Sequence, residues 1–291
     1  MIKKTIIVTF ILFAGYSLFV IYLAPKWWYA SQYTLQGNII KAQDYMYGNN
    51  DSCENVIVGS SLSCRLIMDS LPQTYNLSFA GLSIYEGLNI LTRKQHLPKN
   101  VFIEQNEVMR YADKPFISGL NSRILFHLRK SFPVMRADKQ PLGVMGEQIN
   151  IITQGFLWMY RSLLFPRNET IRKANKKEIY LNMLSLQKDS YSQIPDERLI
   201  KERFNSLNKY IAKLERRGVN FIFFEMPVDS ALNYLPTATT IRQTFRNYYP
   251  ESKYQYIPIP DSVNYETSDG LHLVRSAALS YTVYLKSKIK D

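Results

Sequence analysis

Short apolar segments alternate with amphipathic segments along residues 52–291, and this alternation constrains the fold more than any other feature. Residues 55–59 (NVIVG) form a short β-branched run, which is typical of a buried parallel strand. Residues 196–217 carry apolar side chains on one helical stripe, and Gly218 follows as a helix-ending residue. The sequence therefore predicts an α/β domain with a parallel sheet of about five strands, covered by helices on both faces.

The same patterns give the other elements. The expected strands are 55–59, 74–77, 101–103, 219–224 and 254–259. The expected helices are 62–70, 83–95, 196–217, 241–248 and 274–289. Residues 107–190 break this rhythm, because they are rich in Arg, Phe, Leu and Met and hold few clear strands. We interpret them as an insertion of helices and loops over the carboxyl edge of the sheet.

Residues 5–24 at the N-terminus are apolar and uncharged, and twenty such residues match the hydrocarbon thickness of a bilayer. Lys3 and Lys4 precede them, so the positive-inside rule leaves the N-terminus in the cytoplasm and the rest of the chain on the far side. A cleaved signal peptide is the alternative. A retained anchor is favoured, because the stretch is longer than a usual signal and Ala24-Pro25 is a poor cleavage site.

Three aromatic residues, Trp27, Trp28 and Tyr29, follow the apolar stretch and indicate a membrane-interface belt. The predicted organisation is a cytoplasmic tip and transmembrane anchor at 1–30, a polar stalk at 31–51, and the α/β domain at 52–291.

The formal net charge of +12 is spread along the chain. No nucleic-acid-binding motif accompanies it, so a nucleic-acid partner is not expected. The densest basic cluster is Arg172, Lys173, Lys176 and Lys177. It is either a solvated face or a contact for anionic lipid or an acidic glycan. No cluster of histidine and cysteine has metal-ligand spacing, and we expect neither a metal nor a cofactor.

The chemistry-bearing residues are Ser61, at the end of the first expected strand, and Asp269 and His272 near the C-terminus. A serine hydroxyl becomes a nucleophile when an imidazole takes its proton and a carboxylate orients that imidazole. Ser61 would also open a helix whose amides favour an oxyanion. The alternative is that Ser60 or Ser61 merely caps this helix. We interpret the other two histidines, His96 and His127, as structural or exposed.

These motifs resemble the SGNH (GDSL-like) hydrolase family. The family's nucleophile in Gly-Asp-Ser matches Ser61, and its Asp-x-x-His before the last helix matches Asp269 and His272. The resemblance implies an oxyanion hole formed by the amide of Ser61, by Gly81 after the second strand, and by Asn106 after the third. It covers roughly residues 52–290 apart from 107–190, and it implies a three-layer flavodoxin-like fold.

Two positions depart from the family pattern: Ser60 replaces its aspartate, and Glu104 stands where it often has glycine. These changes resemble the membrane-anchored branch that serves O-acetylation of alginate and peptidoglycan and D-alanylation of teichoic acid. Glu104, Glu107, Arg65 and Arg110 flank the motifs, as solvated residues or as substrate contacts.

The resemblance implies a serine O-acetylesterase or O-acetyltransferase, with its domain outside the bacterial cytoplasmic membrane. It would act on a cell-envelope or exported polysaccharide, beside a membrane-bound O-acyltransferase. One alternative is a catalytically silent glycan-binding or scaffolding partner of such an acyltransferase. Another is a general lipid or small-ester esterase. The choice between hydrolase and transferase stays open.

Overall fold

The chain's structure is a computed structural model that describes residues 1–25, 28, 30, 33–48, 52–164, 169–260 and 263–289, with the side chains of 158–164 and 169–175 excepted. It comprises two compact units. We call them the helical unit, Met1–Gly48 with Pro115–Arg167, and the sheet unit, Asn49–Lys114 with Asn168–Asp291. Each of the predicted site residues belongs to the sheet unit.

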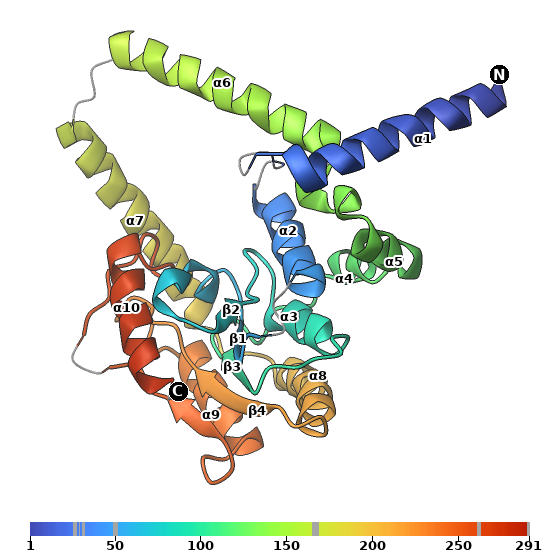
Figure 1. Cartoon of the computed structure of the whole chain (residues 1–291). Helices are drawn as coiled ribbons and strands as arrows, with labels where there is room; N and C mark the ends of the chain where they lie inside the picture. Colours follow the sequence, from blue (N-terminus) through green and yellow to red (C-terminus); the bar gives the residue numbers. More distant parts are fainter. Residues whose placement is uncertain are drawn as a thin grey trace. The chain divides into compact units, whose positions relative to one another are not determined.

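The sheet unit contains five parallel strands in the order β2-β1-β3-β4-β5 (Figure 1). The strands are β1 (Asn55–Val58), β2 (Thr74–Asn76), β3 (Asn100–Glu104), β4 (Asn220–Phe224) and β5 (Gln255–Ile257). The predicted α/β class with one parallel five-stranded sheet is confirmed. The chain moves outward from β1 to β2, then returns past β1 to β3, and this reversal creates a crevice position at the carboxyl ends of β1 and β3.

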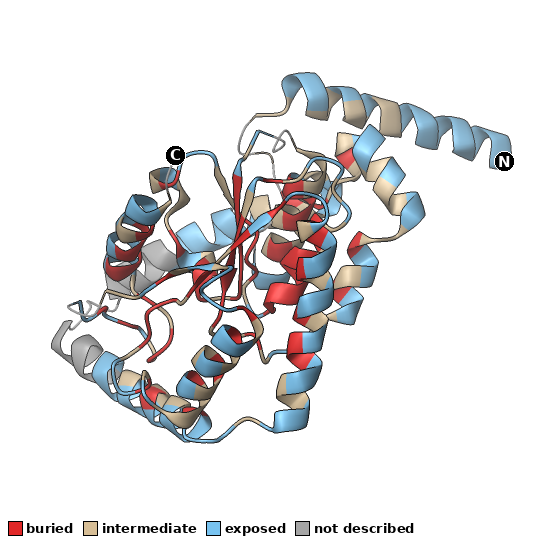
Figure 2. Ribbon diagram, turned by 90° about the horizontal axis from the view of Figure 1, so that it is seen from below, coloured by how far each residue is buried: buried red, intermediate tan, exposed pale blue. Residues whose placement is uncertain are grey.

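Side chains along each strand alternate between the two faces of the sheet, and each face packs against other parts of the unit. On one face, Ile57 and Phe102 are paired in register and share a core with Tyr281 near the C-terminus. On the other face, the ring of Phe223 packs against that of Phe245, with centroids 5.3 Å apart. Figure 2 shows the buried residues along the strands and on the inward sides of the flanking helices.

Five α-helices belong to the sheet unit: α3 (Ile84–Leu91), α7 (Glu169–Tyr191), α8 (Glu197–Glu215), α9 (Pro236–Tyr248) and α10 (Arg275–Lys288). Side-chain caps fix two of their starts. The Ser83 hydroxyl accepts the Tyr85 amide at 3.2 Å, and the Glu86 carboxylate accepts the Ser83 amide at 2.9 Å. Asp196 caps α8 by accepting the amide of Leu199 at 2.8 Å.

The predicted helix at 62–70 is wrong. This segment forms two short 3-10 turns, Ser63–Arg65 and Met68–Ser70. An α-helix would join the Ile67 amide to the Ser63 carbonyl. Instead, the Ile67 amide donates to the Thr282 hydroxyl at 3.1 Å, and the Ser63 carbonyl accepts the Asn76 side-chain amide at 2.8 Å. Long-range side-chain partners thus replace the helical bond.

The helical unit comprises α1 (Ile2–Leu18), α2 (Thr34–Tyr47), α4 (Lys114–Leu120, starting at the unit boundary), α5 (Arg123–Ser131) and α6 (Pro141–Leu164). Residues 31–51, expected as a stalk, contain α2. This helix buries Ala42 and Tyr45, and its Gln43 side chain accepts the Ala137 amide at 2.7 Å. Of the expected insertion at 107–190, residues 115–167 fall in the helical unit and the rest in the sheet unit.

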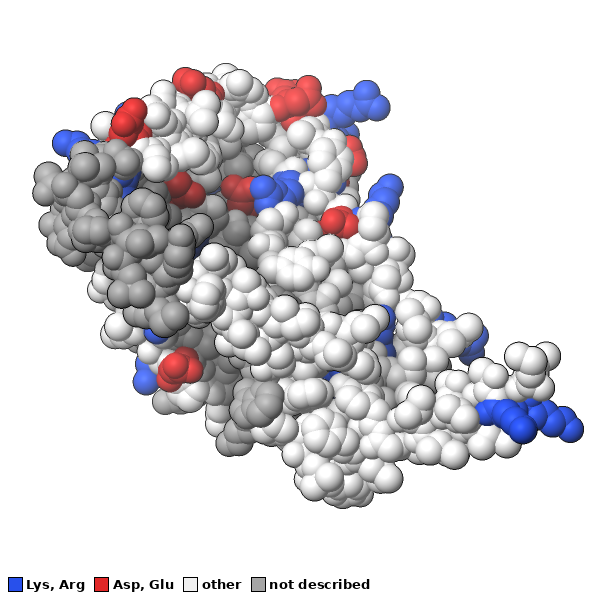
Figure 3. Space-filling view, turned by 90° about the horizontal axis from the view of Figure 1, so that it is seen from above, with Lys and Arg blue, Asp and Glu red and all other residues white. Residues whose placement is uncertain are grey.

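The first helix continues through a wider turn, Phe19–Leu23, so that Ile2–Leu23 is long and apolar enough to cross a bilayer. A signal sequence would meet the same criterion. Figure 3 shows the exposed surface of this helix as uncharged up to the basic side chains near its N-terminal end. Trp28 packs edge-on against Phe19 at 5.3 Å. Trp27 and Tyr29 of the expected aromatic belt lie outside the described residues.

Candidate active site

Ser61, His272 and Asp269 form a continuous hydrogen-bonded chain in the sheet unit. His272 Nε2 lies 2.9 Å from Ser61 Oγ, and His272 Nδ1 lies 2.6 Å from Asp269 Oδ2. Because Nδ1 faces a carboxylate, we assign the proton to Nδ1, which leaves Nε2 to accept the serine proton. The structure thus brings together three residues that the sequence separates by up to 211 positions.

The Asp269–His272 turn is fixed before any substrate binds. Asp269 Oδ1 accepts the backbone amides of Leu271 and His272 at 3.1 and 2.8 Å. Burial raises the pKa of Asp269, but these amide bonds and the His272 ring outweigh it, so its pKa lies below the ordinary 3.8 and the carboxylate stays ionised. Gly270 supplies the turn's left-handed backbone, with φ of 92°.

Ser61 lies in a turn that Glu104 holds from the neighbouring strand β3. Glu104 Oε2 accepts the amides of Ser60 and Ser63 at 2.9 and 3.1 Å, and Oε1 accepts the Ser60 hydroxyl at 2.6 Å. The Ser63 hydroxyl is a fourth donor. Gly59 permits this approach, since a Cβ there would lie 2.5 Å from Glu104 Oε2. Ser60 is therefore engaged within the network, and Ser61 is the serine that faces His272.

Two sequence-based expectations about this turn are corrected. Glu104 is neither solvated nor a surface contact for substrate, because it is fully buried. Ser61 does not open an α-helix, so no helix dipole acts on an oxyanion there, and neither Ser60 nor Ser61 caps one. The Ser60 hydroxyl instead accepts the Leu62 amide at 3.2 Å within the turn.

The three expected oxyanion-hole groups lie after β1, β2 and β3. Within the described part of the chain, the backbone amides of Ser61 and Gly81 donate no hydrogen bond, so both are available to a ligand. Gly81 is exposed and has φ of 76°. The Asn106 side chain is engaged: Nδ2 donates to the Met226 carbonyl at 3.0 Å, and Oδ1 accepts the Met226 amide at 2.8 Å. The second N–H of the Asn106 side-chain amide remains available to donate a hydrogen bond to a ligand.

The other flanking charges have separate roles. Burial, reinforced by the Glu104 charge, raises the pKa of Glu107 from 4.5 to about 7. The Arg110 guanidinium, whose Nε lies 3.9 Å from Glu107 Oε2, opposes this increase. Arg65 donates to the Leu273 carbonyl at 3.3 Å, beside His272. His96 and His127 are exposed. Among the described residues, no group of three or more His, Cys, Asp or Glu side chains is arranged to hold a metal ion.

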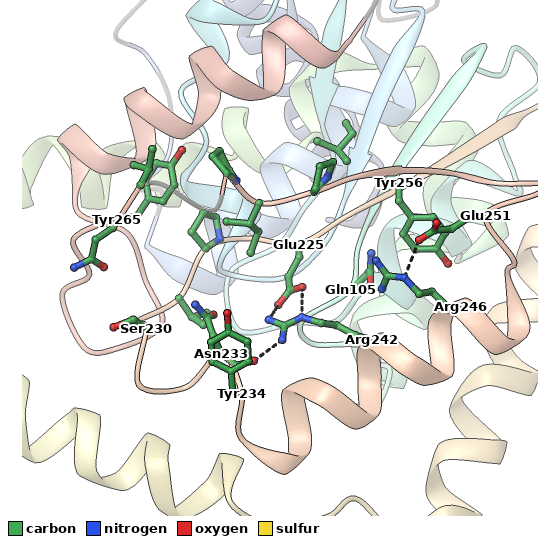
Figure 4. A pocket seen from close by; sticks show the side chains of 18 of the residues that line it. Gln105, Glu225, Ser230, Asn233, Tyr234, Arg242, Arg246, Glu251, Tyr256 and Tyr265 are labelled. Atoms are coloured by element: carbon green, nitrogen blue, oxygen red, sulfur yellow. Dashed lines mark hydrogen bonds and ion pairs between the residues drawn. The ribbon is translucent and has the colours of Figure 1, made fainter.

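The sheet unit contains a cavity of about 1030 Å³, and none of the three triad residues lines it. Figure 4 shows the side chains that form its wall. We call it the α9–β5 cavity, because most of its wall comes from α9, from β5 with the segment before it, and from the segments that follow β4 and β5. Gln105, which follows β3, completes the wall. Arg242 forms an ion pair with Glu225 across it, and Arg246 forms one with Glu251. A second cavity of about 600 Å³ includes Lys176 and Lys177 of the predicted basic cluster.

No sequence pattern indicates the Arg242–Glu225 pair, because the two residues are 17 positions apart and meet only when α9 packs against the segment after β4. Comparisons of the chain with protein-family models, with curated proteins and with solved structures give no match.

Proposed function

We propose that this protein is a membrane-anchored serine acyl-transfer enzyme of the SGNH type, an O-acetylesterase or O-acetyltransferase. The observation that carries the proposal is the Ser61–His272–Asp269 chain, with contacts of 2.9 and 2.6 Å. A partly exposed hydroxyl, an imidazole assigned the required tautomer and an ionised carboxylate are the parts that nucleophilic acyl transfer needs. The free amides of Ser61 and Gly81 support it as oxyanion donors.

In the first half-reaction, His272 Nε2 takes the Ser61 proton while Oγ attacks the carbonyl carbon of an ester. The tetrahedral oxyanion accepts hydrogen bonds from the Ser61 and Gly81 amides and from the remaining N–H of Asn106. Collapse breaks the ester bond, and His272 returns the proton to the leaving alkoxide, which departs as an alcohol. Asp269 stabilises the imidazolium throughout.

In the second half-reaction, a hydroxyl attacks the carbonyl carbon of the acyl-Ser61 ester, and His272 takes the proton of that hydroxyl. Collapse of the tetrahedral intermediate breaks the bond between Ser61 Oγ and the acyl carbon, and His272 returns the proton to Ser61 Oγ. The product is a new ester if a sugar attacks and a free acid if water attacks. Hydrolase and transferase therefore share every residue of the triad. They differ in which hydroxyl reaches the acyl group.

The strand order 2-1-3-4-5 supports the family assignment, since it is the order of flavodoxin-like sheets. The apolar helix Ile2–Leu23 supports a single-pass anchor in a bacterial cytoplasmic membrane, with the sheet unit extracytoplasmic. The substrate would be a cell-envelope or exported polysaccharide. A membrane-bound O-acyltransferase would be the partner that supplies the acyl group.

One observation favours a second candidate, a catalytically silent glycan-binding or scaffolding partner of such an acyltransferase. Both ends of the Asn106 side-chain amide are engaged with Met226, which limits its freedom to follow a developing oxyanion. A silent partner would keep the binding surface without turnover.

The test is hydrolysis of p-nitrophenyl acetate by the full chain in lipid nanodiscs. We expect Ser61→Ala to lower the rate at least about 10³-fold, to the uncatalysed background. Ser280→Ala, which removes an exposed hydroxyl from α10 of the same unit, is the matched control and should match wild type. Equal rates for wild type and Ser61→Ala would refute the nucleophile assignment and favour the silent partner.

A further inference from the structure

We propose that the α9–β5 cavity binds an uncharged oligosaccharide, the hydroxyl-bearing acceptor in the acyl transfer. The acceptor role rests on the proposed function. The binding itself rests on the chemistry of the cavity wall alone. At about 1030 Å³, the cavity is at the upper end of the range for small-molecule sites.

Two buried amide oxygens in the wall have no partner in the described part of the chain. They are Oε1 of Gln105, a residue only 4% exposed, and Oδ1 of Asn233. A buried acceptor without a donor costs about 1–3 kcal/mol, so native proteins rarely leave one unsatisfied. Each oxygen exposes less than 1 Å² of surface, so a ligand hydroxyl would reach it after a shift of the Gln105 or Asn233 side chain and would then satisfy it.

The charges of the cavity select hydroxyl groups over ions. Arg242 Nη2 lies 2.5 Å from Glu225 Oε1, and Arg246 Nε lies 2.8 Å from Glu251 Oε1 (Figure 4). Arg242 also donates to the Asn233 carbonyl. Each guanidinium is thus neutralised within the wall, which leaves neither an excess of positive charge for an anion nor one of negative charge for an ammonium group.

Tyrosine rings form much of the remaining wall, among them Tyr234, Tyr256 and Tyr265. Tyr234 is 86% exposed, so its ring is accessible to a ligand. A pyranose ring presents an apolar C–H face and an equatorial rim of hydroxyls. Aromatic faces and unpaired amide oxygens in one cavity match these two features.

Part of the cavity wall comes from the carboxyl edge of the sheet, where the triad lies. Gln105 directly precedes Asn106 at the end of β3, and Tyr265 lies four residues before Asp269. The Asp229 amide, from the segment between β4 and α9, donates to the Gly270 carbonyl at 2.8 Å. A glycan bound along the cavity would therefore continue toward the Asp269–His272 turn.

The experiment measures binding without turnover, by calorimetry on the full chain in lipid nanodiscs free of glycoside detergent. The probes are three β-linked oligomers that differ in charge: cellohexaose (neutral), β-1,4-linked oligoglucuronate (anionic) and a chitosan oligomer (cationic). We expect cellohexaose to bind at least about tenfold more tightly than either charged probe. Tyr234→Ala and Gln105→Leu should each weaken this binding about tenfold.

Tyr33→Ala, which removes a 66% exposed tyrosine from the helical unit, is the matched control. Because Tyr234 is exposed, its variant should fold even if Gln105→Leu does not. Absence of cellohexaose binding, tighter binding of a charged probe, or equal affinity in Tyr234→Ala and Tyr33→Ala would overturn the proposal.

The assay separates this inference from the proposed function. Cellohexaose binding that depends on Tyr234, combined with esterase activity that does not depend on Ser61, would leave a glycan-binding protein without the enzyme. Ser61-dependent activity without cellohexaose binding would leave the enzyme and remove the acceptor site.

Discussion

Replacing Glu104 tests whether its buried carboxylate positions the nucleophile. In Glu104→Ala the amides of Ser60 and Ser63 lose their acceptor, and both residues are 0% exposed, so neither amide faces bulk water. Each buried unsatisfied N–H costs roughly 1–3 kcal/mol, which gives about 4 kcal/mol for the pair. The Ser63 hydroxyl adds little to this cost, because it keeps its hydrogen bond to the Ser78 hydroxyl at 2.8 Å.

Glu104→Gln provides a graded comparison. Its single amide oxygen, placed where Oε2 now lies, would still accept both backbone amides, so we expect a loss of only about 1 kcal/mol from the weaker neutral bonds. The chain has two units, so a local assay separates an effect on this turn from changes elsewhere in the chain.

Hydrogen exchange measured by mass spectrometry on a peptide covering 59–66 reports local opening. We expect Glu104→Ala to lower protection by about 10³-fold and Glu104→Gln by about tenfold. Esterase activity should fall in the same order. Glu202→Ala, at a side chain 60% exposed, is the control and should match wild type. Wild-type protection and activity in Glu104→Ala would refute the positioning role.

Three further substitutions test other parts of the site. Asp269→Asn should lower the p-nitrophenyl acetate rate about 10⁴-fold with the turn intact, because the imidazole then loses its tautomer and counter-charge; a loss below about tenfold would contradict this. Glu107 has a folded pKa raised from 4.5 to about 7, so its ionisation opposes folding increasingly as pH rises between these values. Glu107→Gln should therefore raise the thermal midpoint at pH 8 and leave it unchanged at pH 4, and the opposite pattern would refute the shift. Gly270→Ala should destabilise the protein by about 1–3 kcal/mol in denaturant unfolding, because φ is 92° and the new Cβ would lie 2.9 Å from Leu184 Cδ1; unchanged stability would show that the turn is relaxed.

The sheet was predictable because burial on both faces demands uninterrupted β-branched and aromatic runs, as in NVIVG at 55–59. The meeting of Ser61 with His272 followed from placing each motif at the carboxyl edge of that sheet. Both inferences use local patterns that one fold rule joins.

Long-range polar contacts were not predictable. The sequence pattern of 62–70 predicts a helix. In the structure, the Ile67 amide donates to the Thr282 hydroxyl, and the Ser63 carbonyl accepts a hydrogen bond from the Asn76 side chain. Glu104 was predicted to be solvated or to contact substrate, because no sequence pattern indicates that four hydrogen-bond donors surround its carboxylate. The division of 107–190 between two units likewise depends on packing between segments far apart in sequence.

The account's central claim is tested most directly by acid-quenching the full chain during p-nitrophenyl acetate turnover and locating the covalent adduct by peptide mass spectrometry. We predict one acetyl group on Ser61, absent in Ser61→Ala. Acetylation confined to lysine side chains and unchanged in Ser61→Ala would contradict it.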